Sequence, residues 1–357
     1  MGLMGIKVEL LSEKNEEKWE EFVSLPNNAG VWHTLKWERI IEKEYGFKPY
    51  YLLAIDGVEV CGILPLFQVK SLITGNRIVS LPFSYNCGPV ANSDESYTLL
   101  VNEARKLAEK LKCKYLELKM GTPLPTDSIE QNQLIESKFF YTSVLNLTPD
   151  PEVIWFNMDA RRTKWAVRKA IRENVKIRTE TDHEDIKILH DLKVKTRQKH
   201  GSPSPSLQFF QKIMEEFGPT DIVKLWVAEY DNRIVSALMF YAFKDTVMPA
   251  YIASDDDYKS YMPNNLLYWQ AIEWGCKNGY KYFDFGRTEP ENETLLKFKS
   301  KWGCQNYKIP YYYYPKQPKL LSQNRDSFKV NLVTNCWKKA PVPLLKVLGP
   351  HLLKHVG

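Results

Sequence analysis

The chain has 357 residues, of which 44% are apolar and 26% charged, and its formal net charge is +6. This composition is that of a globular protein, and at ~150 residues per domain the length indicates about two domains. No stretch approaches the ~20 uncharged apolar residues of a membrane-spanning helix, and the net charge is too small for a uniformly basic nucleic-acid-binding chain.

The amino-terminal segment and the cysteines bear on localisation and cofactors. The first residues turn acidic within a dozen positions and lack the cationic start and apolar run of a secretory signal, so we expect a cytoplasmic protein. The six cysteines include no CxxC pair, which argues against a zinc site or a disulfide framework. We therefore expect buried, reduced thiols, no metal and no resident cofactor.

In the first half, apolar patterns and turn signals predict a hairpin, further strands and one helix. The hairpin turns at Asp56-Gly57, and Ser93 is the expected helix N-cap. In chain order the predicted elements are 50–70 for the hairpin, 77–82 for a strand, 93–112 for the helix, and 115–119 and 141–147 for two strands. A Pro-Asp-Pro sequence ending at Pro151 then closes the module near residue 150.

The second half repeats this order of elements. They are a hairpin at 225–243 with its turn at Asp231-Asn232, a strand at 247–254, a helix at 263–279 and a strand at 282–285. The hairpins are offset by 226 − 51 = 175 residues and the strands after the helix by 282 − 115 = 167, which predicts one module used twice. We predict a mixed α/β fold of two tandem domains, each a largely antiparallel sheet flanked by helices. The domains span 1–150 and 151–320, and a basic amphipathic C-terminal extension follows at 321–357.

Between the two modules lies the strongest concentration of charge. From Arg161 through Arg178 eight residues are basic and only Glu173 is acidic. On a helix, a basic stripe would face outward and an apolar stripe would pack inward. The basic stripe comprises Arg161, Lys164 or Trp165, Arg168 and Arg172, and the apolar stripe comprises Ala166, Val167, Ala170 and Ile171. Such a basic stripe suits phosphate groups, and a solvated helix face is the equally weighted alternative.

A second polar cluster follows the last strand of the second module. Alternation along Phe283-Asp284-Phe285 buries both phenylalanines and sends Asp284 to the opposite face, near Arg287 and Lys299. A cation can stabilise the oxyanion that forms when an amine attacks an ester or thioester, and a carboxylate can orient it or accept a proton. Lys299, Asp284 and Arg287 are therefore candidate catalytic residues of acyl transfer, with a structural ion-pair network as the alternative.

Two parts of the chain resemble the FemABX-like transferases, over roughly residues 28 to 315. They are VWHTLKWERIIEKEYGFKPYYLLAIDGVEVCGILPLFQVK with the later RIVSLPFSYNCGPV, and NNLLYWQAIEWGCKNGYKYFDFGRTEPENETLLKFKSKWG. The resemblance implies two acetyltransferase-like (GNAT) folds and transfer of amino acids from aminoacyl-tRNA to a peptidoglycan precursor peptide. Other relatives belong to envelope or exopolysaccharide systems, so the family does not fix the donor.

The same resemblance implies roles for individual positions. The Phe298-Lys299 pair is similar to the family's motif near the acyl end of the donor. The basic stripe is similar to a basic helix between the family's modules, and we expect it to bind the donor. The segments around Lys36 and Tyr85-Asn86 are similar to the acceptor side, where Lys36 would meet an anionic acceptor such as a nucleotide-sugar pyrophosphate.

One departure from ordinary acetyltransferases bears on the donor. Acyl-CoA enzymes of the GNAT kind carry a glycine-spaced turn whose backbone N–H groups hold pyrophosphate, and neither module has one. The corresponding stretch contains three consecutive carboxylates at 255–257, which would repel the phosphates of coenzyme A. Aminoacyl-tRNA is the favoured donor and acyl-CoA the alternative.

The tail at 337–357 has four lysines, no acids and leucines at near-helical spacing. It can lie on an anionic membrane surface, but because three prolines limit its helix we favour docking onto the protein body. The sequence as a whole predicts an acyltransferase, in the cytoplasm or at the inner face of the membrane. It would move an aminoacyl or acyl group from an activated ester to an amine of a small or lipid-linked cell-envelope precursor. The alternatives are an acyl-CoA-dependent N-acetyltransferase and a non-catalytic membrane-associated or RNA-binding module.

Overall fold

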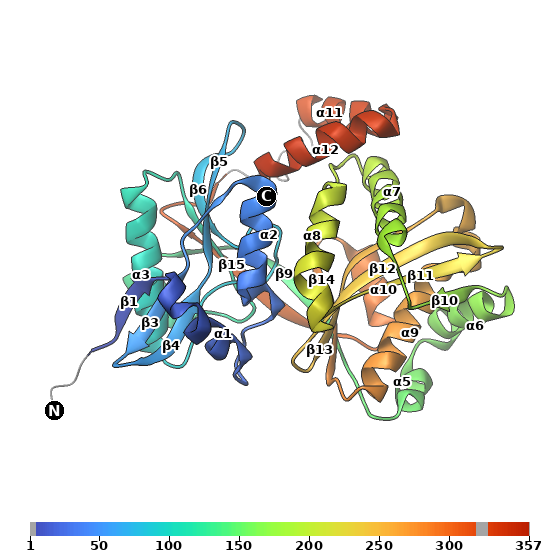
Figure 1. Ribbon diagram of the computed structural model, residues 1–357, viewed down its shortest axis with the longest axis horizontal. Coiled ribbons are helices and arrows are strands. Elements are labelled where there is room, and N and C mark those ends of the chain that lie inside the picture. Colours follow the sequence, from blue (N-terminus) through green and yellow to red (C-terminus); the bar gives the residue numbers. More distant parts are fainter. Residues whose placement is uncertain (1–4, 319–327, 357) are drawn as a thin grey trace. The chain divides into compact units, whose positions relative to one another are not determined.

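The computed structural model describes residues 5–318 and 328–356, so 321–327 and Gly357 of the predicted extension lie outside the described residues (Figure 1). Contacts between residues divide the chain into two compact units. The first unit runs up to Phe140 and includes a segment that begins at Lys308; the second comprises Tyr141–Tyr307 and the C-terminal helices as far as Leu353.

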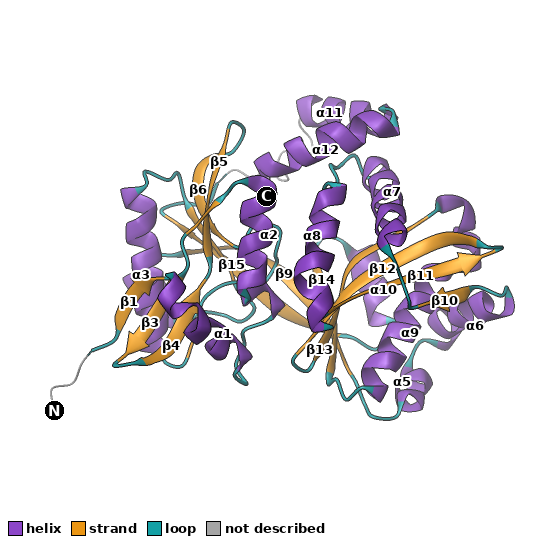
Figure 2. Ribbon diagram, in the orientation of Figure 1, coloured by secondary structure: helices purple, strands orange, loops and turns teal. Residues whose placement is uncertain are grey.

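The first unit combines short helices and strands with one long helix (Figure 2). Its helices are η1 (Glu13–Asn15), α1 (Glu16–Ser24), η2 (Val31–His33), α2 (Leu35–Tyr45), α3 (Asp94–Lys110) and α4 (Thr126–Gln131). Its strands are β1 (Lys7–Leu10), β2 (Lys48–Pro49), β3 (Leu52–Asp56), β4 (Glu59–Leu64), β5 (Leu66–Ser71), β6 (Gly75–Ser80), β7 (Val90–Ala91) and β8 (Leu116–Lys119).

Local sequence explains the hairpin and the long helix of this unit. The β3–β4 turn holds Gly57 at φ 62°, a conformation that glycine adopts without strain. The helix α3 begins where the Ser93 hydroxyl accepts the N–H of Ser96 at 3.2 Å. The predicted hairpin and helix are confirmed. Pro65, which has no N–H to donate, separates β4 from β5 where one continuous run was predicted.

The second unit is a sheet with helices on both faces. Its helices are α5 (Pro151–Asn157), η3 (Ala160–Lys164), α6 (Trp165–Arg172), α7 (His183–Lys199), α8 (Leu207–Phe217), η4 (Gly218–Thr220), η5 (Asp256–Tyr261), α9 (Pro263–Lys277) and α10 (Glu293–Ser300). Its strands are β10 (Lys176–Arg178), β11 (Val223–Tyr230), β12 (Arg233–Phe243), β13 (Thr246–Ser254) and β14 (Tyr282–Thr288). The helix α9 packs on β11, β12 and β13, and Figure 1 shows α7 and α8 on the opposite face.

Both units repeat one topology. In each, an antiparallel hairpin ends in a strand that pairs in parallel with the strand after a helix: β6 with β8 around α3, and β13 with β14 around α9. The first parallel pairs are Ile78 with Leu116 and Thr246 with Tyr282, which gives offsets of 246 − 78 = 168 and 282 − 116 = 166 residues. The predicted fold class, a mixed α/β fold built of similar modules, is confirmed.

Two further strands contribute residues to both units: β9 (Ile135–Asn146) and β15 (Gln305–Tyr314). In the first unit β15 pairs antiparallel with β8, and in the second unit β9 pairs antiparallel with β14. The sequence predicted part of β9 and missed β15, α5 and α10. The run Tyr311–Tyr314 is aromatic throughout, so it lacks the alternation that signals a strand.

The C-terminal helices α11 (Phe328–Lys339) and α12 (Val342–Val356) end the described chain. The indole of Trp337 donates to the carbonyl of Ser202 at 3.0 Å, and Lys346 forms an ion pair with Asp191 of α7 at 2.6 Å. The described part of the tail up to Leu353 thus belongs to the second unit. Within residues 5–318 and 328–356, every helix is too short or too polar to cross a bilayer.

Candidate active site

A β-bulge in β14 shapes the candidate site of the second unit. Opposite β9, Asp284 pairs with Val144 but Arg287 pairs with Thr142, so β14 contains one extra residue between these positions. Gly286 lies in this extra turn of the backbone with φ 75°, which favours glycine. The bulge therefore interrupts the alternation of side chains beyond Phe285.

The carboxylate of Asp284 is buried within this bulge. It accepts the Thr142 hydroxyl at 2.5 Å and the backbone N–H of Gly286 at 2.8 Å. Phe283 and Phe285 are buried as predicted, but Asp284 is only 8% exposed. Phe283 and Phe285 pack in one buried apolar cluster, and the Asp284 carboxylate instead accepts the N–H of Gly286 in the bulge.

Lys299, near the end of α10, is the buried cation of this site. It is 3% exposed, and its Nζ donates to the carbonyl of Gly286 at 2.5 Å. Burial lowers the pKa of Lys299 to about 8, and the charge of Asp284 opposes this shift. Burial also raises the pKa of the neighbouring Cys304 thiol to about 12, so that thiol stays protonated at neutral pH. The structure thus brings Lys299 and Asp284 together at Gly286.

The other two residues predicted near Lys299 have different surroundings. Arg287 follows the bulge and is exposed. Phe298 is half-buried in an aromatic cluster, with its ring centroid 6.1 Å from that of Tyr268 and 6.3 Å from that of Trp302. The aromatic cluster fixes α10 against β14 and α9, and so holds Lys299 in place.

The basic segment before the sheet forms the predicted helix, and its first turn is wider than an α-helical turn. Residues Ala160–Lys164 form a π-helical turn that Asp159 caps by accepting the N–H of Arg162 at 2.7 Å, and α6 continues it. The predicted inner stripe is buried at Ala166, Val167 and Ala170, but Ile171 is 56% exposed, so its assignment to that stripe is wrong. The predicted outer residues Arg161, Arg168 and Arg172 are exposed, and Lys164 is half-buried.

Aromatic rings lie among these cations, and of these rings the sequence placed only Trp165 on the basic stripe. The Lys164 ammonium lies 5.6 Å from the ring of Phe156, which is 80% exposed. The Lys169 ammonium lies 5.4 Å from the ring of Trp165, which is 47% exposed. The Arg168 guanidinium lies 5.4 Å from the ring of Trp155. We call this surface the basic aromatic patch: Trp155, Phe156, Arg161, Arg162, Lys164, Trp165, Arg168, Lys169 and Arg172.

The basic aromatic patch is joined to the helix that carries Lys299. The backbone N–H of Asp159 donates to the carbonyl of Lys301 at 3.0 Å, and the hydroxyl of Thr163 donates to the same carbonyl at 3.3 Å. Lys301 directly follows α10 and lies two residues after Lys299. The basic aromatic patch and the buried ammonium of Lys299 therefore share one local framework.

A second cationic centre lies on α7, and no sequence motif pointed to it. Lys193 donates to the carbonyl of Ile252 at 3.3 Å, and its ammonium lies 5.7 Å from the ring of Tyr251. One helical turn later, Arg197 donates to the carbonyl of Pro203 at 3.1 Å. Burial lowers the pKa of Lys193 to about 8 and also lowers that of Arg197, while it raises that of Tyr251. In the sequence, the only indication of this centre was that Lys193 and Arg197 are four residues apart and so lie on the same face of a helix.

The acidic stretch at 255–257 is not the bare negative loop that the sequence indicated. The carboxylate of Asp256 pairs with Lys199 at 2.9 Å and also with Lys259. The carboxylate of Asp255 lies 3.8 Å from Lys195. Because these lysines compensate much of the charge, repulsion of coenzyme A by this stretch is weaker than the sequence implies.

The residues predicted on the acceptor side lie in the first unit. Lys36 is half-buried in the first turn of α2, and Tyr85 and Asn86 are half-buried in the loop after β6. The carbonyl of Tyr85 accepts the hydroxyl of Tyr311 at 3.0 Å. His33 Nε2 lies within hydrogen-bond distance of the Gly88 carbonyl, at 3.0 Å, and its Nδ1 accepts the N–H of Gly30, so this imidazole has a structural role.

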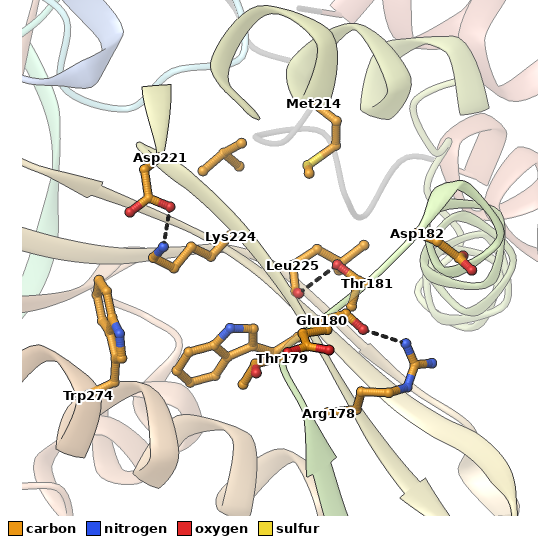
Figure 3. Close-up of a pocket in the computed structure, with 12 residues that line it drawn as sticks. Arg178, Thr179, Glu180, Thr181, Asp182, Met214, Asp221, Lys224, Leu225 and Trp274 are labelled. Carbon is orange, nitrogen blue, oxygen red and sulfur yellow. Dashed lines mark hydrogen bonds and ion pairs between the residues drawn. The ribbon is translucent and has the colours of Figure 1, made fainter. Parts of the chain in front are cut away.

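A separate hollow of about 740 Å³ lies beside β11 in the second unit (Figure 3). Both of its lining cations are paired: Lys224 with Asp221, which also lines the hollow, and Arg178 with Asp185 and Glu229, which lie outside the lining. These ion pairs leave no buried group that calls for a ligand, so we assign no chemistry to this hollow. Nor do His, Cys, Asp or Glu side chains in the described part of the chain gather in threes as a metal site requires.

Comparison with known proteins agrees with this architecture. A sequence model of the acetyltransferase (GNAT) domain matches residues 159–308. The crystal structure of FemX is similar with a TM-score of 0.68 at 14% identity, covering 90% of this chain and 100% of that chain. A tandem GNAT protein from the clavulanic acid biosynthesis pathway has a TM-score of 0.53 at 11% identity, covering 88% and 100% of the two chains.

A third similar structure is L-PGS from Bacillus licheniformis, with a TM-score of 0.50 at 13% identity, covering 85% of this chain and 96% of that one. No curated protein matches the chain in sequence. The GNAT match covers the unit that contains Lys299, and the structural matches extend over most of the chain. The chain has a FemABX-like fold of the GNAT type, and residues 159–308 match the acetyltransferase (GNAT) domain.

Proposed function

We propose that the protein transfers an aminoacyl group from aminoacyl-tRNA to an amine of a cell-envelope glycan or peptide precursor. The observation that carries the proposal is the attachment of the basic aromatic patch to α10 through Asp159, Thr163 and the carbonyl of Lys301. Arginine and lysine neutralise phosphates, and exposed aromatic rings stack on unpaired bases such as those at the end of a tRNA. An acyl group attached to that end would then be held near Lys299.

In the reaction, the acceptor amine attacks the ester carbonyl of the donor. A C–N bond forms, the C–O bond to the terminal ribose breaks, and the proton lost by the amine passes to the leaving ribose oxygen. An ammonium has three N–H donors, and Lys299 gives one of them to the carbonyl of Gly286. A further donor can stabilise the oxyanion of the tetrahedral intermediate. The charge of Asp284 keeps this ammonium protonated near neutral pH.

For the acceptor we propose an anionic precursor. The half-buried cations Lys193 and Arg197 on α7 suit a phosphate or carboxylate group, because burial strengthens a charge-assisted hydrogen bond. In the first unit Lys36, Tyr85 and Asn86 supply a cation and polar groups for the same class of molecule. A nucleotide sugar or a lipid-linked pyrophosphate carries the charge that these groups would recognise.

An acyl-CoA-dependent N-acetyltransferase is the second candidate. It is favoured by the match of residues 159–308 to an acetyltransferase domain and by the ion pairs that compensate Asp255 and Asp256. The oxyanion role of Lys299 is the same for a thioester, so this candidate differs from the first only in the donor.

Calorimetric titration of the full chain with aminoacyl-tRNA and with coenzyme A, at matched salt, distinguishes the two donors. For tRNA we expect binding that weakens steeply with salt, and the log–log slope should fall by about one for each phosphate contact removed. Arg161→Ala and Arg168→Ala should each reduce the slope, whereas Lys106→Ala and Lys110→Ala on exposed α3 should not. Binding of coenzyme A without binding of tRNA would replace the first candidate by the second.

A further inference from the structure

The last helix of the chain has two distinct faces. On its inner side Leu345, Gly349 and Leu353 are buried, and a side chain at Gly349 would lie 3.1 Å from the carbonyl oxygen of Ser204. On its outer side four large apolar residues repeat at helical spacing. These are Leu344, Val347, Leu348 and Leu352, with exposures of 47%, 63%, 41% and 37%. We call these four residues the outer face of α12.

The charge around this face has a single sign. The last 31 residues of the sequence, 327–357, contain five lysines and neither Asp nor Glu. In the described part of the tail, Lys338 and Lys339 are exposed at the end of α11, just before α12. Lys346 reaches Asp191 of α7 and so fixes the rotation of α12 with its apolar residues turned outward.

We propose that the outer face of α12 docks on the surface of an anionic lipid bilayer, with the helix lying in the plane of the interface. An exposed apolar stripe flanked by lysines is the pattern of interfacial helices, and anionic headgroups complement the lysines. The helix is too short and too polar at its ends to span the bilayer. Only the outer face would enter the headgroup region, because the inner face is already packed on the second unit.

A second copy of the chain fits this surface less well. A two-fold interface would place the same lysine-rich segment of both copies against itself, where the charges repel. A bilayer containing acidic lipids instead attracts the exposed lysines at the end of α11. The proposal does not depend on the donor or the acceptor of the transferase reaction.

Flotation of the full chain with vesicles tests the proposal. We expect binding to vesicles of phosphatidylcholine with 30% phosphatidylglycerol, at least tenfold weaker binding to pure phosphatidylcholine, and weakening by salt. The variant Leu344→Ser/Val347→Ser/Leu348→Ser should bind the anionic vesicles at least tenfold more weakly. Lys338→Gln/Lys339→Gln should bind severalfold more weakly and with a smaller salt dependence.

The matched control is Val58→Ser, which removes an apolar side chain that is 72% exposed in the turn between β3 and β4. It should bind vesicles like the unmodified chain. Thermal melting of every variant checks the fold, because the substituted residues are all exposed. Unchanged vesicle binding by the triple serine variant would overturn the proposal. A chain that is dimeric in light scattering, and becomes monomeric in that variant, would overturn it in favour of a self-association surface.

Discussion

The ammonium of Lys299 donates a hydrogen bond to the carbonyl of Gly286 at 2.5 Å. In a regular antiparallel strand the backbone N–H and C=O groups form hydrogen bonds with the neighbouring strands. A backbone carbonyl can accept a hydrogen bond from a side chain where this pattern is interrupted. The bulge between Asp284 and Arg287 provides that break. The backbone of β14 thus orients the cation that we assign to the oxyanion.

The pH dependence of transfer should report on Lys299. Because burial lowers its pKa to about 8, the charged form is present below that pH and lost as the pH rises through it. We expect kcat to fall on the alkaline side with an apparent pKa near 8. Lys299→Arg should retain some activity without this limb, since a guanidinium stays charged, and Lys299→Met should lose ~100-fold or more. An unchanged alkaline limb in Lys299→Arg would assign the titration to another group.

Replacing Asp284 by Asn should shift the alkaline limb of the pH profile of kcat. The carboxylate favours the protonated form of Lys299, so its removal lowers the pKa of Lys299 further, and the alkaline limb should shift to lower pH. The control is Thr142→Val, which removes a hydrogen-bond donor to Asp284 but leaves the charge. It should shift the limb less than Asp284→Asn does. A shift to higher pH in Asp284→Asn would contradict the proposed coupling.

Gly286→Ala separates the role of the bulge from general backbone strain. An L side chain at φ 75° costs about 1–2 kcal/mol of stability. Gly57→Ala, at φ 62° in the β3–β4 turn of the first unit, should cost a similar amount, because no atom obstructs its Cβ. We expect comparable losses in thermal stability but a large loss of kcat only in Gly286→Ala. Equal kcat in the two variants would show that the bulge does not position Lys299.

The sequence predicted the elements that have local signals, such as turns and helix caps, and missed the pairing of strands that lie far apart in the chain. The turns at Gly57 and at Asp231-Asn232 and the Ser93 cap are encoded locally, and each is found where predicted. The topology of β9 and β15 is not local, since each strand pairs with a strand of the other module. No repeat within the sequence specifies that exchange of partners.

In the candidate site, too, the residues could be predicted from the sequence, but the features that depend on tertiary packing could not. The sequence identified Lys299 and Asp284 as neighbours, but the bulge that joins them depends on the pairing of β14 with β9, which alternation cannot reveal. The cations of α7 were missed because the sequence does not show that Lys193 lies against the ring of Tyr251 or that burial lowers the pKa of Lys193 and of Arg197. Burial of a charge is a property of tertiary packing, not of composition.

The exposed ring of Trp165 should contribute to donor binding through stacking. A base stacked on an aromatic side chain is worth ~1–3 kcal/mol, so Trp165→Ala should weaken aminoacyl-tRNA binding about tenfold, and Trp165→Phe should restore much of it. Ile171 is the matched control, since it lies on the same helix and is 56% exposed. Ile171→Ala should leave the affinity unchanged. Equal weakening by both substitutions would indicate a general effect on α6 instead of stacking.

The half-buried cations of α7 should act on the acceptor alone. Removing a hydrogen bond to a charged group costs ~1.5–3 kcal/mol, so Arg197→Ala should raise the KM for an anionic acceptor by about tenfold to a hundredfold. Lys195→Ala is the control on the same helix, because Lys195 is exposed and only approaches Asp255 at 3.8 Å. Arg197 also holds the carbonyl of Pro203, so thermal melting must accompany the kinetics. A rise in donor KM of equal size in Arg197→Ala would mean that this centre binds the donor, and the acceptor assignment would then fall to the first unit.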